Sequence, residues 1–458
     1  MQEILETLIL DFHSRCRKGY LPQPIIRQTC LLGSEGKIDA VIGVRRSGKT
    51  WYLFQTMHTM HRDGVSWENI LYINFEDERL IPIEAKDLHL IEKTFYELYP
   101  DKTDEKCFFF FDEIQNVQGW DLYVRRLLDS GRVQLFITGS SAKLLSTEIS
   151  TSLRGRSLST VIFPLSFHEF LRFRGQNPLS SHRVNSDIRA AMVNFFKQYL
   201  LVGGFPEVQN VSDFDRIKIL QEYMQSIMYR DIVERHNIKN LVALRRLISH
   251  LINNYAQLFS VNKFYNHLRS QQIKVDKNQL YFMTECLQDA FFVFLVSIHT
   301  DSEKARQVNP HKLYLIDPGM VIAGLKKSSP DWGSLLENVV FLELKRQGWR
   351  IEYYRTRKGL EVDFLVTDPI SRQSALVQVS LNMKDKTTQA REFNAAEAAM
   401  TETGIKTCYV ITGRESGVTH LENGKLVIIP AWQLAIDART ILFPGTGIED
   451  QRIPLPHF

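Results

Sequence analysis

The sequence predicts an α/β chain whose first part is a parallel sheet built around a phosphate-binding loop. Short apolar strands alternate with helical patterns up to about residue 165, as in sheets whose strands are joined by helices. The run 43–50 (GVRRSGKT) directly follows the apolar segment 38–42 and stands at the start of a helical pattern. A second apolar run, 107–111 (CFFFF), ends in Asp112 and Glu113. These observations predict a phosphate loop and two carboxylates at the same edge of one sheet.

Five strands are expected in this first part of the chain. The run 107–111 is apolar at every position, which is typical of a strand covered by helices on both faces. One whole strand, 70–75, lies between the phosphate loop and the acidic strand. The expected strands are 37–42, 70–75, 107–111, 133–138 and 160–163, with helical patterns between most of them.

The run 43–50 predicts binding of a nucleoside triphosphate. Its glycines let backbone N–H groups turn toward the phosphates, and the following helix adds its positive N-terminal end. Lys49 would supply a positive charge to the β- and γ-phosphates, and the Thr50 hydroxyl would be a Mg²⁺ ligand. The candidate nucleotide-binding residues of the loop are Gly43, Val44, Arg45, Arg46, Ser47, Gly48, Lys49 and Thr50.

Asp112 and Glu113 predict hydrolysis of the bound nucleotide. In a parallel sheet they follow their strand at the carboxyl edge, beside the phosphate loop. Asp112 would hold Mg²⁺ through water, and Glu113 would polarise the attacking water. Phosphoryl transfer needs charge neutralisation and an aligned nucleophile more than covalent chemistry. We therefore expect a Mg²⁺-dependent ATPase.

Composition favours a multidomain protein of the cytoplasm. At 458 residues the chain should hold about three domains. The net charge of +4 gives no general attraction to nucleic acid, and the five cysteines lack the spacing of a zinc site or a disulfide framework. The N-terminal pattern carries Glu3 and Glu6 on an amphipathic helix, so no secretory signal is expected. The longest apolar stretch, 290–298, is too short to span a membrane.

Several motifs extend the interpretation to a family. The extra strand before the acidic strand, and the glutamate directly after the aspartate, resemble the branch of P-loop ATPases that includes the AAA+ superfamily. With the later motifs the chain resembles a bacterial and archaeal group of predicted AAA+ ATPases. The C-terminal part of that group is a domain of unknown function related to PD-(D/E)XK nucleases. The motifs, in chain order, are FDEIQ (111–115), ITGSSA (137–142), LRGR (153–156), PLSFHEF (164–170), GGFPE (203–207) and YRDI (229–232).

This resemblance implies further site residues and an oligomer. A polar residue after the fourth strand, Thr138 or Ser140, would sense the γ-phosphate. Arg154 or Arg156 could reach the nucleotide of a neighbouring subunit as an arginine finger, which would require a homo-oligomer. The alternative interpretation for either arginine is a surface ion pair with Asp or Glu.

The segment 240–325 has the element order of a winged helix. Helices are expected at 241–255, 260–269 and 276–289, followed by strands at 291–297 and 312–316, with Ser260 and Asp276 as N-caps. The third helix would enter a DNA groove. Because its face also holds acids, a role in packing or protein contact is equally open. The polar candidates are Lys277, Asn278 and Gln279 on the helix, Lys304, Arg306 and His311 in the loop, and the opposing acids Glu285 and Asp289.

The last segment has the outline of a restriction-type nuclease core. That fold binds Mg²⁺ through a helix glutamate, a strand aspartate and an acid-x-lysine pair, and Glu337 and Asp363 occupy the first two positions. The third reads Gln378-Val379-Ser380, so a metal ligand and the lysine are both missing and nuclease activity is doubtful. Lys384 and Lys386 lie downstream and could substitute, although no spacing requires it.

Four domains and two functions follow. The expected domains are an AAA+ core (1–189), a helical lid (190–239), a winged helix (240–325) and a nuclease-like domain (326–458). In the first function, ATP hydrolysis drives a conformational change on a DNA or protein client. In the alternative, the protein is a nucleotide-switched regulatory or defence module with slow turnover. We favour the first, because Glu113 is not required for nucleotide binding alone.

Overall fold

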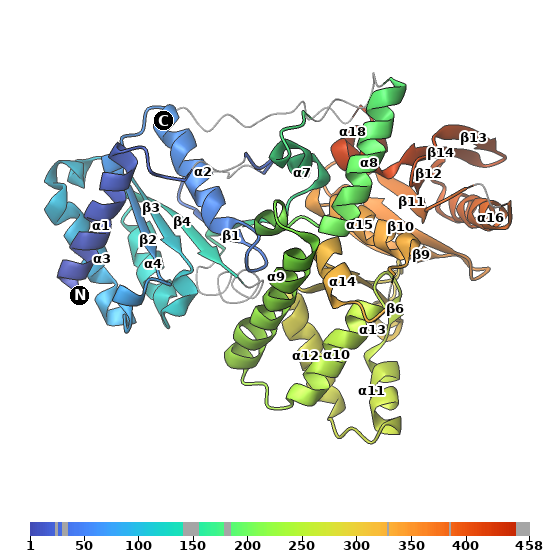
Figure 1. Ribbon diagram of the computed structural model, residues 1–458, viewed down its shortest axis with the longest axis horizontal. Helices are drawn as coiled ribbons and strands as arrows, with labels where there is room; N and C mark the ends of the chain where they lie inside the picture. Colours follow the sequence, from blue (N-terminus) through green and yellow to red (C-terminus); the bar gives the residue numbers. More distant parts are fainter. Residues whose placement is uncertain are drawn as a thin grey trace. The chain divides into compact units, whose positions relative to one another are not determined.

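The structure is a computed structural model in which two compact units are separated between Ile162 and Phe163 (Figure 1). It describes residues 1–22, 26–29, 35–140, 155–177, 185–327, 329–383 and 386–445, without the side chains of 386–388. No helix among these residues is both long enough and apolar enough to cross a membrane.

The first unit contains a sheet of five parallel strands in the order β2-β3-β4-β1-β5. Strand β4 lies between β1 and β3, so the strand that carries the acids is not adjacent to the strand before the phosphate loop. This confirms the predicted parallel α/β sheet. The strands are β1 (Ile38–Ile42), β2 (Ile70–Asn74), β3 (Cys107–Asp112), β4 (Val133–Gly139) and β5 (Ser157–Val161).

The phenylalanines of β3 explain how the sheet is held. Phe109 and Phe111 belong to one buried cluster and Phe108 and Phe110 to another, because successive side chains of a strand point to opposite faces. The first cluster includes side chains of α1 (Gln2–Arg17), α3 (His89–Leu98) and α4 (Trp120–Asp129), and the second includes those of α1 and α2 (Lys49–Arg62). Both faces of the central strands are therefore buried, as the continuous apolar runs predict. Short helical turns complete the unit: η1 (Trp67–Asn69), η2 (Glu78–Leu80), η3 (Ala85–Asp87), η4 (Pro100–Asp104) and η5 (Ile114–Asn116).

The fifth strand is shifted from its predicted position. It runs over Ser157–Val161 rather than 160–163, and Ser157 pairs with Ile38 at the start of β1. Its side chains are mostly half-buried, as expected at a sheet edge. Its polar sequence, SLSTV, lacks the apolar run by which the central strands are recognised, and this is why the prediction began too late.

The second unit begins with helices. Helix α7 is closed by a capping box, in which Ser166 Oγ accepts from the Glu169 N–H and the Glu169 carboxylate accepts from the Ser166 N–H. The YRDI motif lies inside a π-helix, η7, a conformation that is frequent at functional sites. These elements are α7 (Phe167–Phe173), α8 (Ser186–Val202), η6 (Pro206–Val208), α9 (Asp213–Ser226) and η7 (Ile227–Glu234).

The double glycine of the GGFPE motif joins α8 to α14 (Pro318–Gly324). The buried Asp317 carboxylate accepts from the Gly204 N–H at 2.6 Å and the Met320 N–H at 3.0 Å. A Cβ on Gly203 would lie 2.2 Å from Asp317 Oδ1, and one on Gly204 would lie 2.3 Å from the Leu165 carbonyl oxygen. Both positions therefore require glycine because other atoms fill the space a side chain would need.

Four helices and a small antiparallel sheet follow. The sheet has the order β6-β8-β7, and its elements are α10 (Leu241–Asn253), β6 (Leu258–Phe259), α11 (Val261–Ser270), α12 (Lys277–Asp289), β7 (Val293–Val296), α13 (Glu303–Val308) and β8 (His311–Leu315). Asp276 caps α12 as predicted, but Ser260 stands at the N-cap of α11 without a side-chain hydrogen bond. The two-residue β6 was not predicted, because so short a strand shows no periodicity. The expected polar loop holds α13, which Ser302 caps.

The last part of the described chain contains a six-stranded mixed sheet of order β13-β14-β12-β11-β10-β9 (Figure 1, orange to red). Helix α16 packs Ala399 and Met400 against Val362 of this sheet, whereas Phe341 of α15 contacts Phe364. The pairing of β10 with β9 shifts register between Val362 and Leu365. The elements are α15 (Trp332–Arg346), β9 (Arg350–Arg355), β10 (Glu361–Thr367), β11 (Ser374–Ser380), α16 (Lys386–Thr403), β12 (Thr407–Thr412), β13 (Gly417–Leu421), β14 (Gly424–Pro430), α17 (Ala431–Ile436) and α18 (Ala438–Leu442).

Candidate functional site

The loop 43–50 adopts a conformation that only glycine allows at its first position. Gly43 has φ of 147°, and a Cβ there would lie 2.1 Å from the Ile162 carbonyl oxygen. Gly48, with φ of 98°, is the N-cap of α2. Arg27 supports the loop from outside, since its guanidinium donates to the Ser47 carbonyl oxygen at 3.0 Å. The Ser47 hydroxyl is buried and has no hydrogen-bond partner among the described residues, so the loop retains an unused polar group.

Lys49 points back into the loop and toward the acidic strand. Its ammonium lies 3.3 Å from the Gly43 carbonyl oxygen and 3.4 Å from Glu113 Oε1, and its side chain is only 5% exposed. Arg45 extends away and pairs with Glu76 at 3.1 Å. Arg46 has φ of 68°, a left-handed conformation that is uncommon outside glycine. The structure thus brings the loop lysine and the predicted catalytic glutamate together.

Asp112 is the centre of a hydroxyl network. One carboxylate oxygen accepts from Thr50 Oγ1 at 2.8 Å and from the Tyr72 hydroxyl at 3.0 Å. The other accepts from Thr138 Oγ1 at 2.5 Å. Burial and the Glu113 charge raise the pKa of Asp112, and the three hydroxyls oppose this rise. Thr50 and Asp112, the two predicted Mg²⁺ ligands, are therefore in direct contact.

Glu113 is held in a strained backbone and stays ionised. Its φ of 53° lies in the left-handed region, where strain is common at functional sites, and its N–H donates to Thr138 Oγ1 at 2.8 Å. Burial raises its pKa, but the Lys49 charge and a hydrogen bond from Gln115 outweigh burial, so the net pKa is lowered. Glu113 is consequently available as a hydrogen-bond acceptor at neutral pH.

The remaining predicted residues of this site have different surroundings. The Thr138 hydroxyl is engaged by both acids, whereas Ser140 is fully buried just beyond β4. Arg156 forms an ion pair with Asp129 of the same chain, and both side chains are about half exposed. Arg154 lies outside the described residues. Which polar residue or arginine contacts a phosphate stays a prediction.

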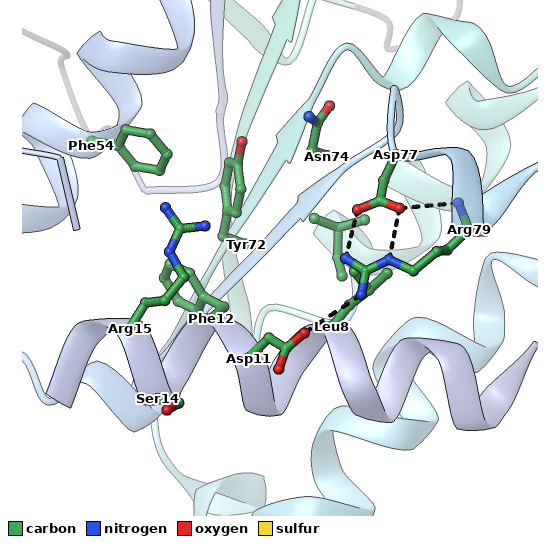
Figure 2. Close-up of a pocket in the computed structure, with 11 residues that line it drawn as sticks. Leu8, Asp11, Phe12, Ser14, Arg15, Phe54, Tyr72, Asn74, Asp77 and Arg79 are labelled. Carbon is green, nitrogen blue, oxygen red and sulfur yellow. Dashed lines mark hydrogen bonds and ion pairs between the residues drawn. The ribbon is translucent and has the colours of Figure 1, made fainter. Parts of the chain in front are cut away.

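Tyr72 was not predicted as a site residue. Its ring lies 5.3 Å from that of Phe54 and 5.6 Å from that of Phe12, and all three line a cavity of about 350 Å³ (Figure 2). Arg79 closes one wall through ion pairs with Asp77 and Asp11. Helices α1 and α2 therefore fix the ring whose hydroxyl holds Asp112. The hydrogen bond between Tyr72 and Asp112 could be predicted only from the strand order, which places β2 beside β3.

The second unit contains a separate acidic cluster. Glu337 of α15 and Asp363 of β10 meet as predicted, and Glu361 joins them. The Lys312 ammonium from β8 lies between all three. Burial and Asp363 raise the pKa of Glu337 to about 7, although Lys312 opposes the rise. Lys312 was missed because it lies outside the segment assigned to the nuclease-like fold.

Gln378 and Ser380, which stand at the acid-x-lysine position, are both described by the structure. Gln378 uses its amide within the protein, accepting from the Asp363 N–H at 3.1 Å and donating to Glu392 at 2.5 Å. Ser380 ends β11 and is buried. Lys384 lies outside the described residues, and so does the side chain of Lys386. Among the residues that the structure describes, no group of three or more His, Cys, Asp or Glu side chains is arranged to hold a metal ion.

The candidate DNA-contacting residues are only partly available. Lys277, Asn278 and Gln279 are exposed at the start of α12. In contrast, Arg306 pairs with Glu303 and Glu352, and burial lowers the pKa of His311. The exposed candidates on this surface are therefore the start of α12 and Lys304 of α13.

Three family models match the chain. Residues 35–171 match an AAA domain, which confirms the predicted P-loop ATPase domain. Residues 194–331 and 332–434 match two domains of unknown function, DUF8612 and DUF4143.

Relatives match almost the whole chain. The uncharacterized protein MJ1544 of Methanocaldococcus jannaschii is 39% identical over 462 residues, which cover 95% of this chain and 100% of that protein. An uncharacterized protein of Haemophilus influenzae is 29% identical over 401 residues, covering 87% and 94% of the two chains.

Solved structures give weaker matches. The Aeropyrum pernix Orc1 protein in complex with DNA is similar at a TM-score of 0.28 and 12% identity, covering 70% of this chain and 91% of that chain. DnaA from Aquifex aeolicus bound to AMPPCP has a TM-score of 0.25 and 14% identity, covering 57% and 73%.

Proposed function

This chain belongs to the same family as the uncharacterized protein MJ1544, and on that premise we propose that it binds and hydrolyses ATP with Mg²⁺. The observation that carries the proposal is the contact of Lys49 with Glu113 beside the Thr50–Asp112 pair. A protein that only bound nucleotide would not need a strained, ionised glutamate at this position.

The residues of this site would have separate roles in nucleotide binding and hydrolysis. The backbone of the loop 43–50 and Lys49 would hold the phosphates, and Thr50 and Asp112 would hold Mg²⁺, which neutralises charge on the phosphate oxygens. Glu113 would accept a hydrogen bond from the attacking water and orient it. Thr138 fixes both acids, and Thr138 or Ser140 would sense the γ-phosphate.

Two substitutions test these roles separately. Glu113→Gln should keep ATP affinity and lower turnover by about 10²-fold or more, because the amide orients water poorly. Lys49→Ala should lose both affinity and turnover. Glu78→Gln, on an exposed side chain, is the matched control and should behave as wild type. Wild-type turnover in Glu113→Gln would show that Glu113 is not the water-orienting residue.

The rest of the chain would act on a client. Helices α10 to α12 with the sheet β6-β8-β7 would form a winged helix, whose exposed Lys277, Asn278 and Gln279 would contact DNA. ATP turnover with and without single-stranded, duplex and branched DNA separates this function from a slow nucleotide switch. Stimulation that is lost in a Lys277→Ala, Asn278→Ala double variant would support a DNA client.

The C-terminal domain would be a binding fold of the PD-(D/E)XK type with little or no nuclease activity. Gln378 is engaged inside the protein, and Ser380 stands where the fold would carry a lysine. DNA incubated with the protein and Mg²⁺ or Mn²⁺ should show no cleavage above that of an Asp363→Ala control. Cleavage that disappears in this control would contradict the proposal.

A further inference from the structure

A buried lysine lies at the centre of the acidic cluster in the second unit. Lys312 Nζ is 2.7 Å from Asp363 Oδ1, 3.0 Å from Glu361 Oε1 and 3.1 Å from Glu337 Oε1. The Lys312 side chain is 4% exposed, and those of Asp363 and Glu337 are 11% and 14% exposed. The lysine comes from β8, whereas its partners come from α15 and β10.

The donors and acceptors of this cluster match. An ammonium group has three N–H donors, and three carboxylate oxygens lie within hydrogen-bonding distance of Lys312. The second oxygen of Asp363 accepts from the Val379 N–H at 2.8 Å, and Glu337 Oε1 also accepts from the Tyr314 hydroxyl at 2.7 Å. The register of β10 against β9 shifts between Val362 and Leu365, the interval that contains Asp363, and such a shift can re-aim a side chain. These contacts hold the carboxylates of Asp363 and Glu337 in fixed positions around the ammonium group.

A divalent cation does not fit these residues as they stand. Mg²⁺ takes oxygen ligands at about 2.0–2.1 Å and would have to lie among the same carboxylates as the ammonium. The one nearby amide that could replace a missing acid, Gln378, is hydrogen-bonded at both ends. A metal at this position would therefore have to displace Lys312 from its only described carboxylate partners.

We propose that Lys312 is a built-in cation that closes the acidic cluster to divalent metal and joins β8 to the C-terminal sheet. In the proposed nuclease-like fold, the lysine would stand where a metal ion is otherwise bound. Tyr314 lies two residues further along β8, and its ring stacks on Phe341 of α15 at 4.3 Å, so the same strand face makes both contacts. This inference does not depend on ATP hydrolysis.

The test counts Mn²⁺ ions bound by the nucleotide-free, full-length protein, using electron paramagnetic resonance. The variants are Asp363→Asn, Lys312→Met, the double variant of the two, and Lys425→Met as a control on an exposed strand residue. Wild type, Asp363→Asn and Lys425→Met should bind equal numbers of ions. Lys312→Met should bind one ion more than the double variant, and Mn²⁺ should raise its melting temperature but not that of wild type.

Two results would overturn the proposal. If wild type binds one ion more than Asp363→Asn, the cluster is a metal site with the lysine in place. If Lys312→Met binds no more than the double variant, Lys312 is not what excludes the metal. Should Lys312→Met fail to fold, Lys312→Gln, which keeps a hydrogen-bond donor without the charge, replaces it in the same comparison.

Discussion

Asp112 depends on three hydroxyl groups that come from three different elements. Thr50 lies in the first turn of α2, Tyr72 lies on β2 and Thr138 lies on β4. A buried carboxylate without such donors would be costly, because each lost hydrogen bond to a charged group removes about 1.5–3 kcal/mol. The proposed Mg²⁺ ligand is therefore oriented before any nucleotide binds.

Tyr72→Phe should weaken this orientation without disturbing the phosphate loop. Burial and Asp112 raise the pKa of Tyr72 well above its ordinary value, so the hydroxyl remains a donor. Its loss should reduce the free energy of unfolding by about 1–3 kcal/mol. ATP turnover should fall severalfold while ATP affinity is unchanged.

Chemical unfolding and steady-state kinetics measure these two effects. Tyr20→Phe, whose side chain is 71% exposed, is the control and should change neither quantity. If Tyr72→Phe equals wild type in both, the hydrogen bond to Asp112 has no role in catalysis or stability.

Single site residues can be predicted from the sequence when their role follows from the strand or helix next to them in the chain. Lys49, Thr50, Asp112 and Glu113 were predicted because each follows a strand or opens a helix, and the structure brings them together. Tyr72 could not be predicted, since it meets its partner only through the order of the strands. Lys312 is a similar case, because its partners lie 25 to 51 residues away along the chain.

The phosphate loop makes a close backbone contact with Ile162, the residue that follows β5. Gly43→Ala should destabilise the first unit, because the new Cβ would lie 2.1 Å from the Ile162 carbonyl oxygen. Gly64→Ala is the matched control, since Gly64 also has positive φ but nothing within 4 Å of its Cβ position. The difference between the variants isolates the clash from backbone strain and should be about 1–3 kcal/mol of unfolding free energy. Equal unfolding midpoints would mean that the loop relaxes freely.

Asp317, which connects the chain after α8 to the start of α14, should make the stability of the protein depend on pH. Burial raises the pKa of Asp317 to about 6, from an ordinary 3.8. The folded chain then holds this proton more tightly than the unfolded chain, so stability from this group is full below about pH 4 and is lost as the pH rises through 6. The loss should reach about 3 kcal/mol.

Asp317→Asn removes this titration. The difference in unfolding free energy between wild type and Asp317→Asn should shrink as the pH rises from 4 to 7. Asp213→Asn, whose side chain is 89% exposed, should show a constant difference. A constant difference for Asp317→Asn as well would mean that its backbone hydrogen bonds compensate for burial.

For the whole molecule, the sequence predicts the parallel sheet and the order of the helices but fails where periodicity is weak. The edge strand β5 is too polar, and β6 is too short, for either to be found from an apolar run. Assembly is a further property that no local pattern fixes. Arg156 pairs with Asp129 in the same chain. This contact agrees with the alternative role for Arg156, a surface ion pair, as opposed to an arginine finger.

Mixing two inactive variants decides whether an arginine acts between subunits. If Arg154 or Arg156 stabilises the transition state in a neighbouring site, its alanine variant should turn over ATP about 10³-fold slower, yet keep an intact Lys49 site. Mixed with Lys49→Ala, it should regain part of the activity, because the Lys49→Ala chain supplies the arginine. Asp129→Ala is the control for Arg156: if it lowers turnover as much as Arg156→Ala, the arginine works through its ion pair within the chain. A protein that remains monomeric with ATP at high concentration and hydrolyses it normally would exclude a finger in trans.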